Sequence, residues 1–226
     1  MMKVKLTPRL SAVASLVKGG GIIADIGTDH GYLPVYLIQS GKVESAIAAD
    51  IGKEPLKNAE KAVEYYDLND KITLRLSDGL REFAPTDANE IVFAGMGGTL
   101  IAEKLAETPW VKNADIHFIF QPQSRAEDLR EYLFSNGFEI INELATHESR
   151  RVYITFDAVY TGKKVDYTMA DCFIGKLPHT EDAHKHLEGQ LKRLEEKYNA
   201  LISCGKMQGT EGLKDTIIAI KEFLNG

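Results

Sequence analysis

The sequence lacks an apolar run of the roughly 20 residues that a membrane-spanning helix needs, and its 226 residues include only two cysteines, Cys172 and Cys204. The basic start at 1–8 is not followed by an apolar segment long enough for a signal peptide. A cytoplasmic location is therefore expected, where both thiols would be reduced and structural. We expect no metal site, since there is no Cys-x-x-Cys pair and the residues of His184-x-His186 would point different ways on a helix.

Positive charge is also scarce, since 27 Lys and Arg face 33 Asp and Glu and the net charge is −6. This balance argues mildly against a nucleic-acid partner, because phosphate contacts come from Lys and Arg clusters. Local basic clusters nevertheless occur, at Lys3, Lys5, Arg9 and Lys18, at Arg150 and Arg151, and at Lys163 and Lys164. Such clusters are most often a solvated surface, so alone they decide nothing.

Strand and helix patterns alternate over 1–160. The predicted strands are 21–23 running into the turn that follows, 46–50, 72–76, 91–94, 116–120, 138–141 and 152–156. Predicted helices begin at Thr7, which suits an N-cap before Pro8, near Leu33, at Pro55, at Thr99 and at Ser124. The last two strands follow each other without a helix, so a mostly parallel, seven-stranded, Rossmann-like sheet should end in an antiparallel pair. This organisation is similar to that of class I methyltransferases.

Residues 161–226 are expected to form a separate linker and helical hairpin. The pattern weakens at 160–178, which predicts an irregular linker. Apolar residues then recur at helical spacing, at Ala183, Leu187, Leu191, Leu194, Tyr198 and Leu201, and after a break at 203–210 again at Leu213, Ile217, Ile220 and Leu224. The antiparallel, coiled-coil-like hairpin could serve packing or dimerisation, or it could grip a large substrate. A monomer and a weak dimer both remain open.

The segment 24–32 (ADIGTDHGY) reads as the end of a strand, a glycine turn and the start of a helix, where α/β proteins bind nucleotides. Asp29 stands where a dinucleotide fingerprint would carry a glycine against the pyrophosphate, and its carboxylate would repel a diphosphate. It would tolerate a ligand with sulfonium and ammonium groups, which describes S-adenosylmethionine (SAM). Asp25, Gly27 and Gly31 complete a motif of moderate specificity.

Acidic residues end the next two predicted strands as well. Asp50, followed by Ile51, could accept both hydroxyls of a ribose, and Asp78 could accept from an adenine amino group while Gly79 admits the ring. Taken singly, Asp50 could be a capping or surface residue and Ser77-Asp78-Gly79 a favourable turn. Three such residues at successive strand ends together favour a cofactor that contains a nucleoside.

The fourth and fifth strand ends have no Asn-Pro-Pro-Tyr type motif of the kind that holds an exocyclic amine. Gly95, Met96 and Gly97 instead form a flat floor beside the transferable methyl group, with Met96 able to line it; a tight strand-to-helix turn is the plainer explanation. Gln121, Pro122 and Gln123 could read a base edge, or form a proline turn in which Ser124 caps a helix.

With these segments the chain resembles the bacterial tRNA (adenine-22-N1)-methyltransferases, SAM-dependent enzymes that methylate N1 of an adenine in the tRNA D-arm. The resemblance spans nearly the full length through Arg9-Leu10, 25–34, 94–98 with 100–102, Gln121-Pro122 and the C-terminal hairpin. Family members often have Glu at Asp50, Ala at Gly31 and Asn at Gln123.

The resemblance implies roles for specific residues. Asp29 is the expected catalytic residue. SAM would be held by Asp25, Gly27, His30, Gly31, Asp50, Ile51, Asp78, Gly79, Gly95 and Met96, and tRNA by Arg9, Gly97, Gln121 and Pro122. His30 could instead contact the substrate or be structural, and Arg9 could meet phosphate, orient Asp29 or lie on the surface.

Three rival functions remain. The missing Gly-x-Gly-x-x-Gly pattern and Asp29 disfavour an NAD-dependent oxidoreductase. A SAM-dependent methyltransferase of a small molecule would use the hairpin as a dimer contact and would not bind tRNA. A non-catalytic RNA-binding protein would use the basic clusters without binding SAM.

Overall fold

The computed structural model describes residues 3–206 and 210–226, and the strands within them form one seven-stranded sheet in the order β3-β2-β1-β4-β5-β7-β6. The strands are β1 (Ile22–Ile26), β2 (Ser45–Asp50), β3 (Ile72–Leu76), β4 (Glu90–Ala94), β5 (His117–Gln121), β6 (Phe138–Glu148) and β7 (Arg151–Tyr160). The helices are α1 (Pro8–Leu16), α2 (Tyr32–Gln39), α3 (Lys53–Tyr65), α4 (Gly98–Ala106), α5 (Ala126–Ser135), α6 (Met169–Ile174), α7 (Glu181–Ser203) and α8 (Thr210–Asn225), with a short 3-10 turn at Pro109–Val111.

Strands β1 to β5 are mutually parallel, and β7 runs antiparallel to both β5 and β6. The predicted sheet, including its antiparallel end, is therefore confirmed. The strand order reverses between β1 and β4, so the crevice at the carboxyl ends of these two strands is the expected ligand site of such a sheet.

Alternate strand residues supply two apolar layers, one on each face of the sheet. Ile23 packs in the layer that also contains Val13 of α1 and Leu37 of α2. Its neighbour Ala24 belongs to the other layer, which includes Phe118 of β5. That second layer also contains Leu187, Leu194, Leu213, Ile217 and Ile220 of the C-terminal helices.

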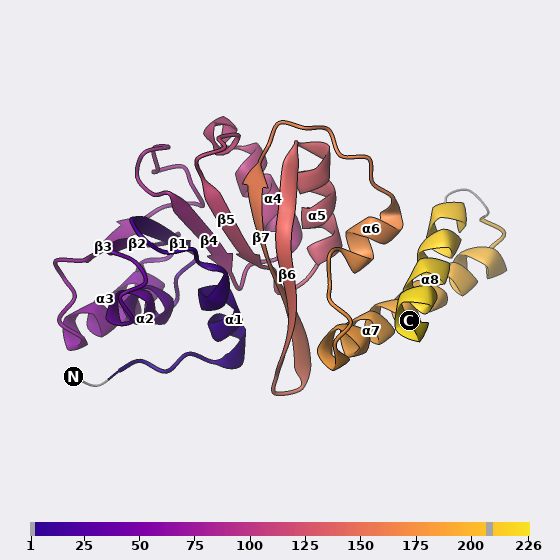
Figure 1. Ribbon diagram of the computed structural model, residues 1–226, viewed down its shortest axis with the longest axis horizontal. Coiled ribbons are helices and arrows are strands. Elements are labelled where there is room, and N and C mark those ends of the chain that lie inside the picture. Colours follow the sequence, from indigo (N-terminus) through magenta and orange to yellow (C-terminus); the bar gives the residue numbers. More distant parts are fainter. Residues whose placement is uncertain (1–2, 207–209) are drawn as a thin grey trace.

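The C-terminal helices α7 and α8 lie side by side at one end of the molecule, as Figure 1 shows. Thr180 caps α7 by accepting a hydrogen bond from the backbone N–H of Ala183, and the predicted seam residues Leu187 and Leu194 are buried. The helical hairpin is therefore confirmed, although 207–209 of the predicted break lie outside the described residues. A division into units 1–160 and 161–226 stays a prediction, because the apolar layer runs across it.

The prediction of an irregular linker over 160–178 was wrong in part, because α6 occupies Met169–Ile174. A capping box starts this helix: the Thr168 side chain accepts from the Asp171 backbone, and the Asp171 carboxylate accepts from the Thr168 backbone. Six residues are too few for a helical period to show. The Thr-x-x-Asp spacing was the available signal.

Arg130 of α5 ties the C-terminal segment to the sheet. Its fully buried guanidinium pairs with Glu143 of β6 and donates to the carbonyl oxygen of Cys172 in α6 at 2.7 Å. Glu143 also accepts from the backbone N–H of Lys176 at 2.7 Å. The path between the sheet and α7 is thus fixed by buried, charge-assisted hydrogen bonds.

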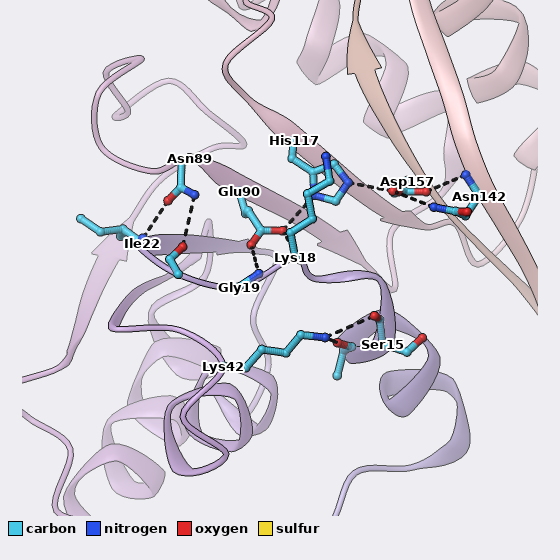
Figure 2. Close-up of polar contacts among 12 residues, drawn as sticks. Ser15, Lys18, Gly19, Ile22, Lys42, Asn89, Glu90, His117, Asn142 and Asp157 are labelled. Carbon is cyan, nitrogen blue, oxygen red and sulfur yellow. Dashed lines mark hydrogen bonds and ion pairs between the residues drawn. The ribbon is translucent and has the colours of Figure 1, made fainter.

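A second buried polar cluster lies at the amino ends of β4 and β5 (Figure 2). His117 of β5 contacts Glu90 of β4 and Asp157 of β7, each at 2.8 Å. Glu90 also accepts from the backbone N–H groups of Lys18 and Gly19, both at 2.8 Å. This cluster joins three strands to the loop before β1. None of the described helices has the length and apolar character to cross a membrane.

Candidate active site

The turn between β1 and α2 needs glycine at two positions. Gly27 has φ 82° and Gly31, the residue before α2, has φ 65°, in the left-handed region that glycine adopts without strain. A Cβ on Gly31 would lie 3.2 Å from the Cβ of Ala59 in α3, and one on Gly27 would lie 3.2 Å from Sδ of Met96. The turn therefore sits tightly between α3 and the loop that follows β4.

A cavity of about 130 Å³ opens at this turn. It brings together six of the predicted site residues, namely Arg9, Asp25, Gly27, Asp29, His30 and Gly31. Leu10, Thr28, Tyr32, Leu33 and Ala94 also line it. Residues from α1, from β1 and its turn, and from β4 thus meet at the carboxyl edge of the sheet, where the strand order reverses.

The site concentrates negative charge around Asp25. Burial raises the pKa of Asp25 to about 6, with repulsion from Asp50 adding to the rise and the Thr28 hydrogen bond and Arg9 opposing it. Burial also raises the pKa of Asp50, assisted by the charge of Asp29 and opposed by the Gly52 N–H, which donates to Asp50 at 2.7 Å. These mutually repelling carboxylates would be relieved by a positively charged ligand.

Asp29 lies at the open side of the cavity, with 73% of its side chain exposed. Its Oδ2 is 3.3 Å from Nε2 of His30, and the His30 ring stacks on Tyr32 with centroids 5.4 Å apart. Asp29 is therefore accessible to a reacting group, and the aromatic pair forms a flat surface beside it.

The residues predicted to bind the nucleoside lie at the ends of β2 and β3 and do not line that cavity. They are Asp50, Ile51, Asp78 and Gly79. Ile51 is 68% exposed, which is unusual for so apolar a side chain and suits contact with a planar ring. Asp78 forms ion pairs with Lys104 at 2.9 Å and Arg81 at 3.3 Å, and the Lys104 hydrogen bond lowers the pKa of Asp78. An adenine amino group would share the Asp78 carboxylate with these two cations. Gly79 lies against the side chain of Lys104.

The loops after β4 and β5 are joined by backbone hydrogen bonds. Gly95 N–H donates to the Gln121 carbonyl at 3.0 Å, and Gln123 N–H donates to the Met96 carbonyl at 2.8 Å. A Cβ on Gly95 would lie 3.6 Å from Arg9 and 3.7 Å from Nε2 of Gln123. Two polar side chains thus lie beside Gly95, the first residue of the expected floor.

Arg9 reaches this floor from α1. Its Nη1 donates to Oε1 of Gln121 at 2.5 Å, and its backbone N–H donates to Glu148 at 2.8 Å. Gln121 is fully buried, and its Nε2 donates to the Pro122 carbonyl at 3.1 Å. Both ends of the Gln121 amide are occupied, so this residue orients Arg9. Contact of Gln121 or Pro122 with a base stays a prediction. Pro122 is buried like Gln121, whereas the next residue, Gln123, is exposed.

Two of the lining residues without a predicted role, Thr28 and Tyr32, contact predicted site residues. Thr28 hydrogen bonds to Asp25, and Tyr32 supports His30. Their place inside the 24–32 motif was the only sequence signal. His184, by contrast, does not line the cavity and packs edge-on against His179 and Phe223, whose rings stack on each other. Among the described residues, no group of three or more His, Cys, Asp or Glu is placed to hold a metal ion.

Comparison with known proteins identifies the relatives of this chain. Residues 6–156 match a methyltransferase domain family. The tRNA (adenine(22)-N(1))-methyltransferase of Bacillus subtilis is 36% identical over 72% of this chain and 71% of its own length.

Solved structures extend this likeness to the whole chain. A Streptococcus pneumoniae protein in complex with SAM is 33% identical, with a TM-score of 0.83 over 97% of this chain and 100% of that one. M. capricolum TrmK, in complex with S-adenosyl-homocysteine, is 25% identical, with a TM-score of 0.79 over 97% and 98% of the two chains. The chain belongs to the tRNA (adenine(22)-N(1))-methyltransferase family.

Proposed function

We propose that this protein transfers the methyl group of SAM to N1 of adenine 22 in tRNA, giving 1-methyladenosine in the D-arm. The observation that carries the proposal is the likeness to the Bacillus subtilis tRNA methyltransferase. A tRNA substrate also supports a cytoplasmic location.

The residues at the β1 turn fit SAM as its cofactor. When bound, SAM supplies a methyl group on a positively charged sulfur. Asp25 and Asp50 offer buried and half-buried carboxylates for its ammonium group and ribose hydroxyls, and exposed Ile51 offers an apolar surface for its adenine. Gly27, Gly31, His30, Gly79, Gly95 and Met96 are proposed to border the same molecule, with Asp78 near the adenine amino group.

The transfer needs alignment more than a strong base, because N1 of neutral adenine already holds a lone pair. A bond forms between the methyl carbon and N1 while the bond from that carbon to sulfur breaks, so the positive charge moves from sulfur to the base. Asp29, exposed at the cavity, is proposed to stabilise that charge or to accept a proton from the base. Arg9 and Gly97 would border the base. The adenine must leave its stack, which costs a few kcal/mol.

The test is methyl transfer to matched tRNAs. Purified protein would be incubated with methyl-labelled SAM and unmodified tRNA transcripts that carry either adenine or guanine at position 22, followed by nucleoside analysis. Label recovered as 1-methyladenosine only with adenine 22 is the expected result. Measurable SAM binding without transfer to either tRNA would contradict the proposal and favour a small-molecule methyltransferase.

A further inference from the structure

A cleft of about 450 Å³ lies where the β5–α5 loop, β7 and α7 meet. Pro122 and Gln123, which directly follow β5, are among its lining residues, and Gln123 flanks Gly95 of the candidate active site. The cleft therefore lies beside the carboxyl end of β5. We call it the basic cleft, after its side chains Arg125, Arg150, Arg151, Lys185 and Arg193.

The basic cleft gathers positive charge on a chain whose net charge is −6. The acidic residue among its lining side chains is Glu127, and it pairs with Arg125 at 3.8 Å, as Asp128 does at 3.0 Å. Within 3–206 and 210–226, the other four cations form no ion pair, and all five are exposed. Uncompensated cations on facing walls repel each other, so a polyanion would be attracted to this cleft.

The walls of the basic cleft are held in place by the fold. Arg150 and Arg151 lie at the β6–β7 turn, and Lys185 and Arg193 lie on α7. The backbone N–H of His147 in β6 donates to Asp182 in the first turn of α7 at 3.0 Å, which fixes one wall to the other. Half-buried His186 of α7 also lines the cleft. Burial, followed by the charges of Arg130 and Arg193, lowers the pKa of His186 to about 4, so this ring is neutral at pH 7.

Four of the five cations are arginines, whose planar forks match phosphate oxygens. We propose that the basic cleft binds the RNA backbone next to the target nucleotide, with phosphates held between the β6–β7 turn and α7. This inference rests on the proposed function, because Gln123, which lines the cleft, also flanks Gly95 of the site where the base would be methylated. It makes α7 a wall of the substrate site, and so favours a gripping role for the helical hairpin over a dimer contact.

The test compares two double variants that remove the same charge. Arg151→Gln with Arg193→Gln removes one cation from each wall. Lys164→Gln with Lys192→Gln is the control, because both lysines are exposed and lie outside the cleft. We expect the arginine pair to weaken tRNA binding at least about tenfold and to flatten its salt dependence, because each lost phosphate contact reduces the slope by roughly 0.7–0.9. The lysine pair should stay within about twofold of the parent protein, and both should bind SAM normally.

A second pair, Arg150→Gln with Lys185→Gln, tests the same walls should the first pair unfold. Unchanged tRNA affinity and salt slope in folded arginine variants would overturn the proposal, and so would an equal loss in the lysine control. The result is separable from the proposed function. A parent protein that binds tRNA through these arginines but does not methylate adenine 22 would support the cleft and contradict the function.

Discussion

Nδ1 of His117 and Oε2 of Glu90 lie 2.8 Å apart at the amino ends of β5 and β4, on the edge of the sheet opposite the candidate active site (Figure 2). The other ring nitrogen lies 2.8 Å from Asp157 of β7. Both nitrogens can donate to the two carboxylates at once only when the ring carries two protons, and these hydrogen bonds raise the pKa of His117 and so favour the imidazolium form. Three strands are thereby joined by one charged residue.

This cluster predicts how stability depends on pH. Burial would lower the pKa of His117, but the hydrogen bonds to Asp157 and Glu90 outweigh burial and raise it above 6.5. The stability that His117 contributes is fully present below pH 6.5 and is lost as the pH rises through its raised pKa. Burial would raise the pKa of Glu90 and Asp157, but hydrogen bonds from His117 and from backbone N–H groups lower both, so their contribution is lost as pH falls below 4.5 and 3.8. Thermal melts should show the cluster stabilising most between these limits, with the loss on the alkaline side absent from a His117→Gln variant.

Removing the central ring should be costly at neutral pH. His117→Gln leaves two buried carboxylates without a countercharge, which destabilises by about 3–5 kcal/mol. His147→Gln is the control, because His147 is exposed. Urea denaturation would measure both free energies of unfolding. Equal free energies of unfolding for the two variants would mean that the charges of His117, Glu90 and Asp157 do not stabilise the fold.

The pKa of Asp25, raised to about 6 mainly by burial, predicts that SAM binding depends on pH. An ionised Asp25 would attract the ammonium group, and below pH 6 a proton must leave before this contact forms. One pH unit below that value, affinity should fall about tenfold. Calorimetric titration with SAM from pH 5 to 8 would measure this affinity. The Asp25→Asn variant should lose the pH dependence, and a pH dependence retained in that variant would assign it to another group.

Asp29→Asn tests the proposed catalytic carboxylate. The amide has the same shape and Asp29 is largely exposed, so the fold and most SAM affinity should survive. Loss of the negative charge beside the base should reduce methyl transfer by at least about 100-fold. Single-turnover assays would measure the rate, with Asp70→Asn, exposed and remote in sequence, as the control. An unchanged rate would exclude Asp29 from the chemistry.

The sequence predicted what is local and missed what is assembled from distant segments. Residues 25–31 were identified because a strand end, two glycines and an unexpected carboxylate stand together within one turn. The bond between Arg9 and Gln121 joins residues 112 positions apart, and the partners of His117 lie on two other strands, so no periodicity reveals either. His117 read simply as part of a buried apolar run. The basic cleft was missed for the same reason, since its walls are distant in sequence and each cation alone resembles an ordinary surface residue.

Two neighbouring glycines offer a matched test of the loop that forms the floor of the site. A Cβ on Gly98 would lie 2.1 Å from the carbonyl oxygen of Arg125, and Gly98 N–H donates to the Ser124 carbonyl at 2.7 Å. Gly98→Ala must therefore push α4 away from the β5–α5 loop, which should destabilise the fold by about 1–3 kcal/mol. A Cβ on Gly97 meets only Oγ of Ser124, at 3.5 Å, so Gly97→Ala should change the free energy of unfolding by less than about 0.5 kcal/mol. Chemical denaturation of both variants measures the difference, and equal stabilities would mean that the two loops are not held together by this close contact.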